Sequence, residues 1–130
     1  MISIIKPKVD NRKFRGGTLK NNIKFILIND KYLTKSYVSV SINAGSYYNP
    51  ENYDGLAHFL EHMLFMGSKK YPQENYFMKK LNEYGGETNA YTSTFGTTYY
   101  FNVHNYGLIV MLDIFSRFFI ILQFDTYIHS

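Results

Sequence analysis

The residues with the clearest capacity for chemistry are His58, Glu61 and His62, which lie within a short apolar run. In a helix, His58 and His62 are one turn apart and project from the same face, with Glu61 beside them. Two imidazoles at this spacing can bind one metal ion, and a neighbouring carboxylate can accept a proton from a water molecule on that metal. The spacing therefore predicts a metal site that activates water.

A second interpretation of the same pattern requires no metal. An amphipathic helix can carry two histidines and a glutamate on its solvated side without any chemistry. Against this, the other side of the segment is uniformly apolar, so the polar residues adjoin a core rather than a broad polar face. The order His-x-x-Glu-His is also the inverse of the His-Glu-x-x-His motif of zinc proteases. Spacing alone leaves both interpretations open.

The composition limits the size of the core and the types of metal ligand. With 130 residues, of which 45% are hydrophobic and 18% aromatic, the chain can fill the core of one domain or of part of a larger one. The sequence contains no cysteine, which excludes disulfides and thiolate zinc ligands. Histidine and carboxylate side chains are therefore the expected metal ligands.

The net charge of +4 is concentrated near the N-terminus. Residues 1–24 contain seven basic residues and one acidic residue, Asp10. Such an arm could contact nucleic acid or acidic lipid. However, its basic residues are not interleaved with aromatic side chains that could stack on bases. A solvated terminal segment is the preferred interpretation, and nucleic acid is not an expected partner.

Neither a secretory signal nor a membrane-spanning segment is predicted. The apolar residues before Lys6 are too few for a signal peptide. The apolar stretch 108–122 is interrupted by Asp113 and Arg117, each of which would cost about 2.5–3.5 kcal/mol at the centre of a bilayer. A buried amphipathic helix with this pair at its surface is the better interpretation. The cytoplasm is the expected compartment.

Hydrophobic periodicity predicts an α+β fold. Strands are expected at 23–28, 37–44, 87–94 and 97–104, and helices at 54–67, 72–84 and 106–122. Gly16-Gly17 is expected to break regular structure within 1–22, and Asp54 and Asn105 are the expected N-terminal caps of the first and last helices. With the elements in this order, we expect helices to cover one face of a largely antiparallel sheet.

Several stretches beyond the five-residue motif carry a family resemblance. They are Asn43-Ala44-Gly45-Ser46, the run from Gly55 to Pro72, the run from Gly85 to Thr92, and Thr98-Tyr99-Tyr100-Phe101. In these stretches the chain resembles the N-terminal part of the inverzincin metallopeptidases of family M16, the pitrilysin and insulin-degrading enzyme group. The resemblance runs from about Leu19 to Asp125, and it is closer to the insulysin branch than to the mitochondrial processing branch.

The resemblance implies a zinc-dependent metalloendopeptidase that hydrolyses peptide bonds. His58 and His62 would bind one zinc ion, and Glu61 would be the general base for a zinc-bound water.

The resemblance also implies how a peptide substrate is held. Asn89 and Ala90 would bind it as an added strand through main-chain hydrogen bonds, and Phe65 would form an apolar wall beside the scissile bond. From spacing alone, Asn89 and Ala90 would be an ordinary strand start and Phe65 a core residue.

A further implication is that the chain is an incomplete copy of a pitrilysin-type domain. Catalytic zinc normally has three protein ligands, and the glutamate that serves as the third in the family would fall beyond residue 130. The expected domains are a basic segment at 1–22, a partial peptidase domain at 23–125 and a divergent tail at 126–130. We expect weak zinc binding and little peptidase activity unless a second chain completes the site. The alternatives are a non-catalytic peptide-binding module and an inactive remnant of such a peptidase.

Overall fold

The computed structural model describes residues 3–57, 70–73 and 75–119 of the chain. Contacts between residues divide the chain into two compact units, Met1–Leu33 and Thr34–Ser130. The expected domain limits at residues 22 and 125 remain predictions.

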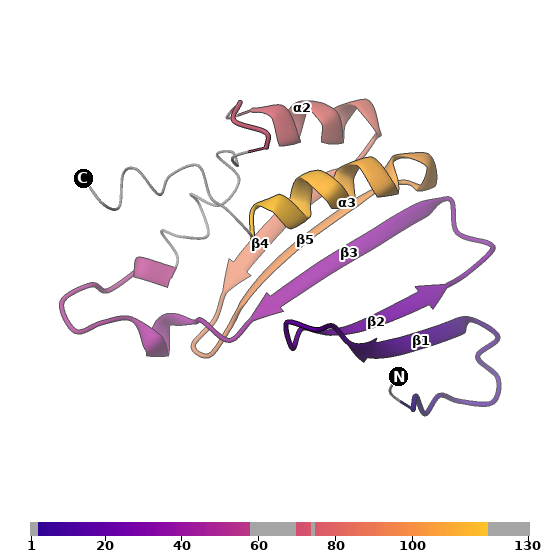
Figure 1. Ribbon diagram of the computed structural model, residues 1–130, viewed down its shortest axis with the longest axis horizontal. Helices are drawn as coiled ribbons and strands as arrows, with labels where there is room; N and C mark the ends of the chain where they lie inside the picture. The colour runs from indigo at the N-terminus through magenta and orange to yellow at the C-terminus, as the bar shows by residue number, and fades with distance from the viewer. Residues whose placement is uncertain (1–2, 58–69, 74, 120–130) are drawn as a thin grey trace. The chain divides into compact units, whose positions relative to one another are not determined.

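The first unit contains an antiparallel hairpin of β1 (Lys13–Thr18) and β2 (Lys24–Asn29) (Figure 1). The β-branched and aromatic residues of β2 form the strand expected at 23–28. β1 was not predicted, because Gly16 and Gly17 were interpreted as strand breakers. Both glycines instead allow close packing: a Cβ atom at Gly16 would lie 3.3 Å from the Ile4 side chain, and one at Gly17 would lie 3.0 Å from the Phe25 ring.

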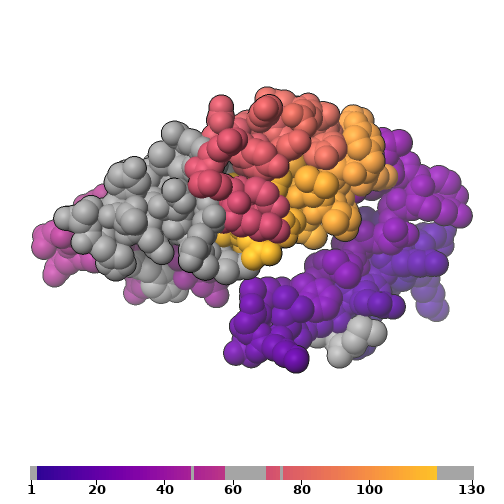
Figure 2. Space-filling model, turned by 45° about the horizontal axis from the view of Figure 1, so that its top comes forward, coloured from indigo at the N-terminus to yellow at the C-terminus, as the bar shows by residue number. Residues whose placement is uncertain are grey.

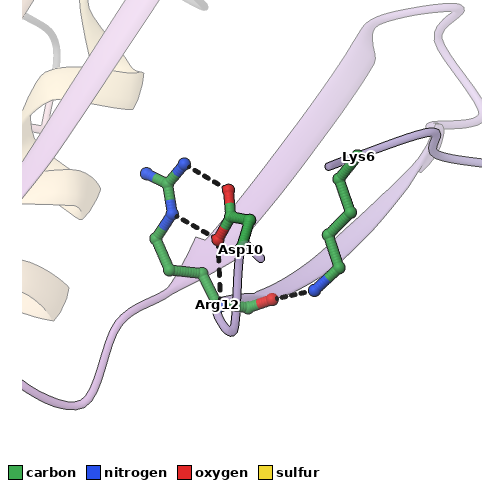
Figure 3. A network of polar contacts seen from close by, with 3 residues as sticks. All are labelled: Lys6, Asp10 and Arg12. Carbon is green, nitrogen blue, oxygen red and sulfur yellow. Dashed lines mark hydrogen bonds and ion pairs between the residues drawn. The ribbon is translucent and has the colours of Figure 1, made fainter. Parts of the chain in front are cut away.

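A polar network joins the residues just before β1 (Figure 3). The Asp10 carboxylate accepts hydrogen bonds from the Arg12 side chain at 3.0 Å (Nε) and 2.6 Å (Nη2), and from the Arg12 backbone N–H at 3.0 Å. Lys6 Nζ donates to the Arg12 carbonyl oxygen at 2.5 Å. The hydrogen bonds from Arg12 lower the pKa of Asp10 from 3.8 to about 2, because they stabilise the ionised carboxylate.

The described part of the second unit contains a three-stranded antiparallel sheet covered by two helices. The strands are β3 (Lys35–Ile42), β4 (Glu87–Thr92) and β5 (Thr97–His104), in the spatial order β3-β5-β4. Helices α2 (Tyr76–Glu83) and α3 (Leu108–Arg117) lie side by side over one face of this sheet (Figures 1 and 2). The predicted α+β class, with an antiparallel sheet and helices on one face, is confirmed.

The core lies between the sheet and the two helices. Alternate residues of β5 point toward the helices and are buried, as the two-residue period of a strand requires. The Phe101 ring lies 4.9 Å from the Phe115 ring of α3 and 6.1 Å from the Phe77 ring of α2, measured between centroids. The buried apolar residues are Phe77, Leu81, Tyr99, Phe101, Val103, Met111, Ile114, Phe115 and Phe118.

The ends of two helices differ from the sequence-based expectation. α2 begins at Tyr76 rather than near Pro72, and the left-handed Gly85 (φ 63°) follows its last turn. α3 begins at Leu108, after a short 3₁₀ helix (Asn105–Gly107). Asn105 was expected to cap this helix, but its side-chain oxygen instead accepts a hydrogen bond from Ser36 Oγ at 2.7 Å.

Two other expectations concern the first and last predicted helices. Leu56 and Ala57 are helical, and the remainder of the helix expected at 54–67 lies outside the described residues. Asp113 and Arg117 form the expected surface pair on α3, at 3.7 Å. Within the described residues, no helix has the length and apolar character needed to span a bilayer.

The first prediction concerns the titration of Asp10. Carboxyl chemical shifts in an NMR titration should give a pKa near 2 for Asp10. The contribution of the Arg12 bonds to the free energy of unfolding is therefore complete above pH 3.8 and is lost as the pH falls toward 2. Arg12→Gln should raise the pKa of Asp10 toward 3.8. Arg15→Gln, which removes a neighbouring charge that does not contact Asp10, is the control. An unchanged pKa in Arg12→Gln would contradict the network.

The second prediction concerns the core of the second unit. Leu81→Ala should lower the free energy of unfolding by about 2–5 kcal/mol, because Leu81 is 0% exposed and its removal leaves a cavity. Met78→Ala on the same helix should change it by less than about 0.5 kcal/mol, because Met78 is 43% exposed. Urea unfolding measures both. Equal losses in the two variants would refute this assignment of the buried face.

Candidate functional site

The residues predicted for the site fall into two groups. Four of them lie outside the described residues, namely His58, Glu61, His62 and Phe65. The other two, Asn89 and Ala90, lie in β4. The described part of the site therefore consists of the β4 edge and of the residues that precede and follow segment 58–69.

β4 is an edge strand of the described sheet, because only β5 pairs with it. In an antiparallel pair, residues that exchange backbone hydrogen bonds with the partner alternate with residues that do not. In the β4–β5 turn, the Ser93 N–H donates to the Gly96 carbonyl at 2.8 Å. By this alternation, Asn89 and Tyr91 bond to β5, while Ala90 directs its backbone N–H and C=O toward the open edge.

The other side of the sheet gives the same alternation. The Asn105 N–H donates to the Thr34 carbonyl at 3.0 Å, which makes the odd-numbered residues of β5 the ones that bond to β3. The even-numbered residues of β5 are then left to bond to β4. Three residues of β4 therefore have outward-facing backbone groups: Thr88, Ala90 and Thr92.

The Asn89 side chain accepts a hydrogen bond from one of these outward-facing backbone groups. Its Oδ1 accepts a hydrogen bond from the Ala90 N–H at 2.8 Å. Asn89 is exposed, whereas the Ala90 side chain is half-buried on the core side of the sheet. An extended peptide that uses the Ala90 N–H must therefore displace the Asn89 amide oxygen.

The chain just before segment 58–69 is fixed by Asn49. Its side-chain Oδ1 accepts a hydrogen bond from the N–H of Ala57, the residue directly before His58, at 3.0 Å. Such an acceptor satisfies a backbone donor that the first turn of a helix leaves unpaired. Asp54 was the expected cap of this helix; the acceptor for Ala57 is Asn49 instead.

The loop that carries Asn49 is bound to the β4–β5 turn. The Ser46 N–H donates to the Ser93 carbonyl at 2.9 Å, and the Tyr47 N–H donates to the Thr94 carbonyl at 2.7 Å. Gly45 makes this approach possible, because a Cβ atom there would lie 2.3 Å from the Ser93 oxygen. The edge of the sheet and the start of the motif segment are thus connected by hydrogen bonds.

The chain just after segment 58–69 is fixed by Asp113 of α3. Its Oδ2 accepts hydrogen bonds from Tyr71 OH at 2.5 Å and from Lys70 Nζ at 2.8 Å. The bond from Lys70, and after it the bond from Tyr71, lowers the pKa of Asp113. The same bonds to Asp113 raise the pKa values of Lys70 and Tyr71. The Tyr71 ring also stacks on the Tyr76 ring at 5.2 Å, with 8° between the ring planes.

The sequence interpretation missed both of these contacts. The pair of Asp113 with Arg117 was predictable from the spacing of one helical turn. The bonds of Asp113 to Lys70 and Tyr71 were not, because they join residues separated by 43 and 42 positions. For Asn49, the signal available was an Asn ahead of a helix start, but the nearer Asp54 fitted that signal better.

The described residues contain no group of three His, Cys, Asp or Glu that could hold a metal ion. The donor set of the motif, two imidazoles with an adjacent carboxylate, suits zinc by its chemistry. A zinc site in this chain would therefore depend on His58 and His62, which lie outside the described residues.

Comparisons with known proteins agree on one family. The family model described as insulinase (peptidase family M16) matches residues 24–127. Insulin-degrading enzyme-like 2 of Arabidopsis thaliana is 45% identical over 117 residues, which are 90% of this chain and 12% of that protein. The insulin-degrading enzyme of Homo sapiens is 45% identical over 122 residues, 94% of this chain and 12% of that protein.

The solved structures give the same result. The crystal structure of pitrilysin matches with a TM-score of 0.91 and 36% identity, over 96% of this chain and 13% of that chain. This chain thus spans about an eighth of the length of each of these relatives. Because the family model covers most of the sequence, the chain belongs to the insulinase family of peptidases, M16.

Proposed function

We propose that this chain carries the catalytic motif of a zinc-dependent metalloendopeptidase that hydrolyses peptide bonds. The observation that carries the proposal is the order His58-x-x-Glu61-His62 within the region that matches the M16 family model. The open edge of β4 supports it, because a peptidase must hold its substrate in an extended form beside the reacting groups.

The three motif residues have distinct proposed roles. His58 and His62 bind the metal, and Glu61 is the general base. When bound, zinc supplies a Lewis acid that polarises the scissile carbonyl and lowers the pKa of the attacking water. Glu61 takes one proton from this water as its oxygen bonds to the carbonyl carbon. It then gives the proton to the amine nitrogen as the C–N bond breaks, and it ends the reaction ionised.

The remaining metal ligand belongs to the same proposal. A catalytic zinc site uses three protein ligands and keeps one position open. We place the third ligand where the family resemblance implies it, after residue 130, or on a second chain.

The substrate is proposed to bind to β4 as an added strand. Ala90 offers one N–H and one C=O to the peptide backbone, and Thr88 extends the same row. The Asn89 side chain gives up its bond to the Ala90 N–H when the peptide arrives. Recognition of this kind reads backbone rather than side chains, so the proposed substrates are unfolded peptides of varied sequence. The proposed role of Phe65 is the apolar wall beside the scissile bond.

Peptide binding without hydrolysis is the second candidate function. The observation that favours it is the same open edge, which needs neither the metal nor Glu61 to bind a strand.

The third prediction concerns the β4 edge. Ala90→Pro should weaken binding of an unfolded fluorescent peptide about tenfold, measured by anisotropy, because proline removes the outward N–H. The fold should survive, since this N–H is not part of the β4–β5 ladder.

The matched variants are Tyr91→Pro and Ala90→Ser. Tyr91→Pro should destabilise the fold, because the Tyr91 N–H bonds to β5. Ala90→Ser keeps the outward N–H and should bind peptide as the wild type does. Unchanged peptide affinity in a folded Ala90→Pro variant would rule out this edge as the binding site.

The fourth prediction concerns catalysis by Glu61. Glu61→Gln should reduce zinc-dependent cleavage of a quenched fluorescent peptide by about 10²–10⁴-fold, because the amide cannot accept the proton of the water. Peptide affinity and zinc content should remain those of the wild type. His58→Ala and His62→Ala should lose zinc as well as activity.

The outcomes separate the two functions. The peptidase function is supported if a chelator stops cleavage, added zinc restores it and Glu61→Gln abolishes it. A wild-type chain that binds the peptide through Ala90 but never cleaves it supports the binding module instead.

A further inference from the structure

The described residues on both sides of the motif segment, 58–69, are bound by side chains distant from them in sequence. At its start, Asn49 Oδ1 accepts the Ala57 N–H at 3.0 Å. At its end, Asp113 Oδ2 accepts Tyr71 OH at 2.5 Å and Lys70 Nζ at 2.8 Å. None of these three contacts involves a proposed metal ligand or the proposed base.

Asn49 is itself held in place by the backbone around it. Its own N–H donates to the Ser46 carbonyl at 3.2 Å, and Ser46 is bound to the β4–β5 turn. Between Asn49 and Ala57, the Tyr53 N–H donates to the Pro50 carbonyl at 3.0 Å, and the Leu56 N–H donates to the Tyr53 carbonyl at 3.2 Å. The Asn49 amide is therefore presented to Ala57 from a bonded loop rather than from a free one.

Asp113 is held in place by α3. The neighbouring Ile114 and Phe115 are each 1% exposed and pack in the core, so the helix cannot shift without disturbing that core. Arg117 Nη2 lies 3.7 Å from the other carboxylate oxygen of Asp113. The Tyr71 ring packs against the same core and stacks on Tyr76, which adds an apolar contact to its bond with Asp113.

We propose that Asn49 and Asp113 are positioning residues that fix the two ends of the segment bearing His58 and His62, and thereby raise its affinity for zinc. The inference rests on the proposed zinc-binding function. Its physical basis is preorganisation: a segment whose ends are fixed loses less conformational freedom when its ligands close around a metal ion. Removing residues that lie outside the metal ligands and orient them commonly weakens metal binding by about 10–100-fold.

The alternative explanation is that both contacts stabilise the fold and have no effect on zinc binding. In that case their loss would lower the free energy of unfolding, and a folded variant would bind zinc as tightly as the wild type does. Zinc affinity, measured by chelator competition under conditions where the variant is fully folded, separates the two explanations.

The fifth prediction starts with Asn49, tested in the 130-residue chain. Asn49→Ala should raise the zinc dissociation constant about tenfold, because the acceptor for the Ala57 N–H is lost. Asn49→Asp keeps an acceptor oxygen at that position and should restore the wild-type constant. Amide hydrogen exchange at Ala57 should quicken in Asn49→Ala and remain slow in Asn49→Asp.

The matched control is Asn21→Ala. The Asn21 Oδ1 likewise accepts a backbone N–H, that of Ile23, at 3.3 Å, but it lies in the β1–β2 hairpin. Its removal should leave the zinc dissociation constant unchanged. A shift equal to that of Asn49→Ala would show that loss of any such bond weakens zinc binding, and it would overturn the proposal.

At the other end, Asp113→Asn and Tyr71→Phe test the second contact. Each should raise the zinc dissociation constant about tenfold, the first by removing the charge that binds Lys70 and the second by removing the hydroxyl. Glu83→Gln is the matched control, because it removes the surface pair of Glu83 with Lys80 at 3.1 Å on α2. It should leave zinc binding unchanged.

The histidine variants distinguish failure of this inference from failure of the proposed function. If the wild type binds no zinc, or if His58→Ala and His62→Ala bind it as the wild type does, the proposed function fails and this inference fails with it. If those variants lose zinc while folded Asn49→Ala and Asp113→Asn stay within about twofold of the wild type, only the positioning role is overturned.

Discussion

The second unit depends on the packing of β5 between its two neighbours and beneath two helices. β5 exchanges backbone hydrogen bonds with β3 on one side and β4 on the other, so its backbone groups are used on both edges. Its inward side chains, Tyr99, Phe101 and Val103, are at most 2% exposed. Among the described residues, β5 is the strand that pairs with β4, and the other edge of β4 is open there. β5 also supports the turn to which the loop before the motif segment is bound.

Sequence patterns predicted the elements whose signals are local. The alternation of residues in β3 and the β-branched and aromatic content of β2 and β5 gave strands close to their observed limits. β1 was missed because a Gly-Gly pair signals a break, and only the packing of Ile4 and Phe25 against those glycines explains a strand there. The prediction that Asn105 caps the last helix was wrong. Its side-chain oxygen instead accepts a hydrogen bond from Ser36, which is distant in sequence.

The candidate site was predictable to a different degree. Spacing identified the motif residues as chemical candidates, and the family resemblance assigned their roles and those of Asn89 and Ala90. The structure describes only the last two, and the roles of all six stay predictions. The contacts of Asn49 and Asp113 had no such signal, since they depend on how separate loops and helices meet in three dimensions. What holds a motif in place is thus harder to read from sequence than the motif itself.

The bond between Asn89 and Ala90 has a consequence for how this chain behaves at high concentration. An open strand edge is a template for pairing with another copy of the same chain, and sheet proteins need some means of blocking it. By occupying the Ala90 N–H, the Asn89 amide removes one donor from that template. Resistance to aggregation and capture of an extended peptide therefore compete for one hydrogen bond, so a change that frees the edge for peptides also exposes it to self-association.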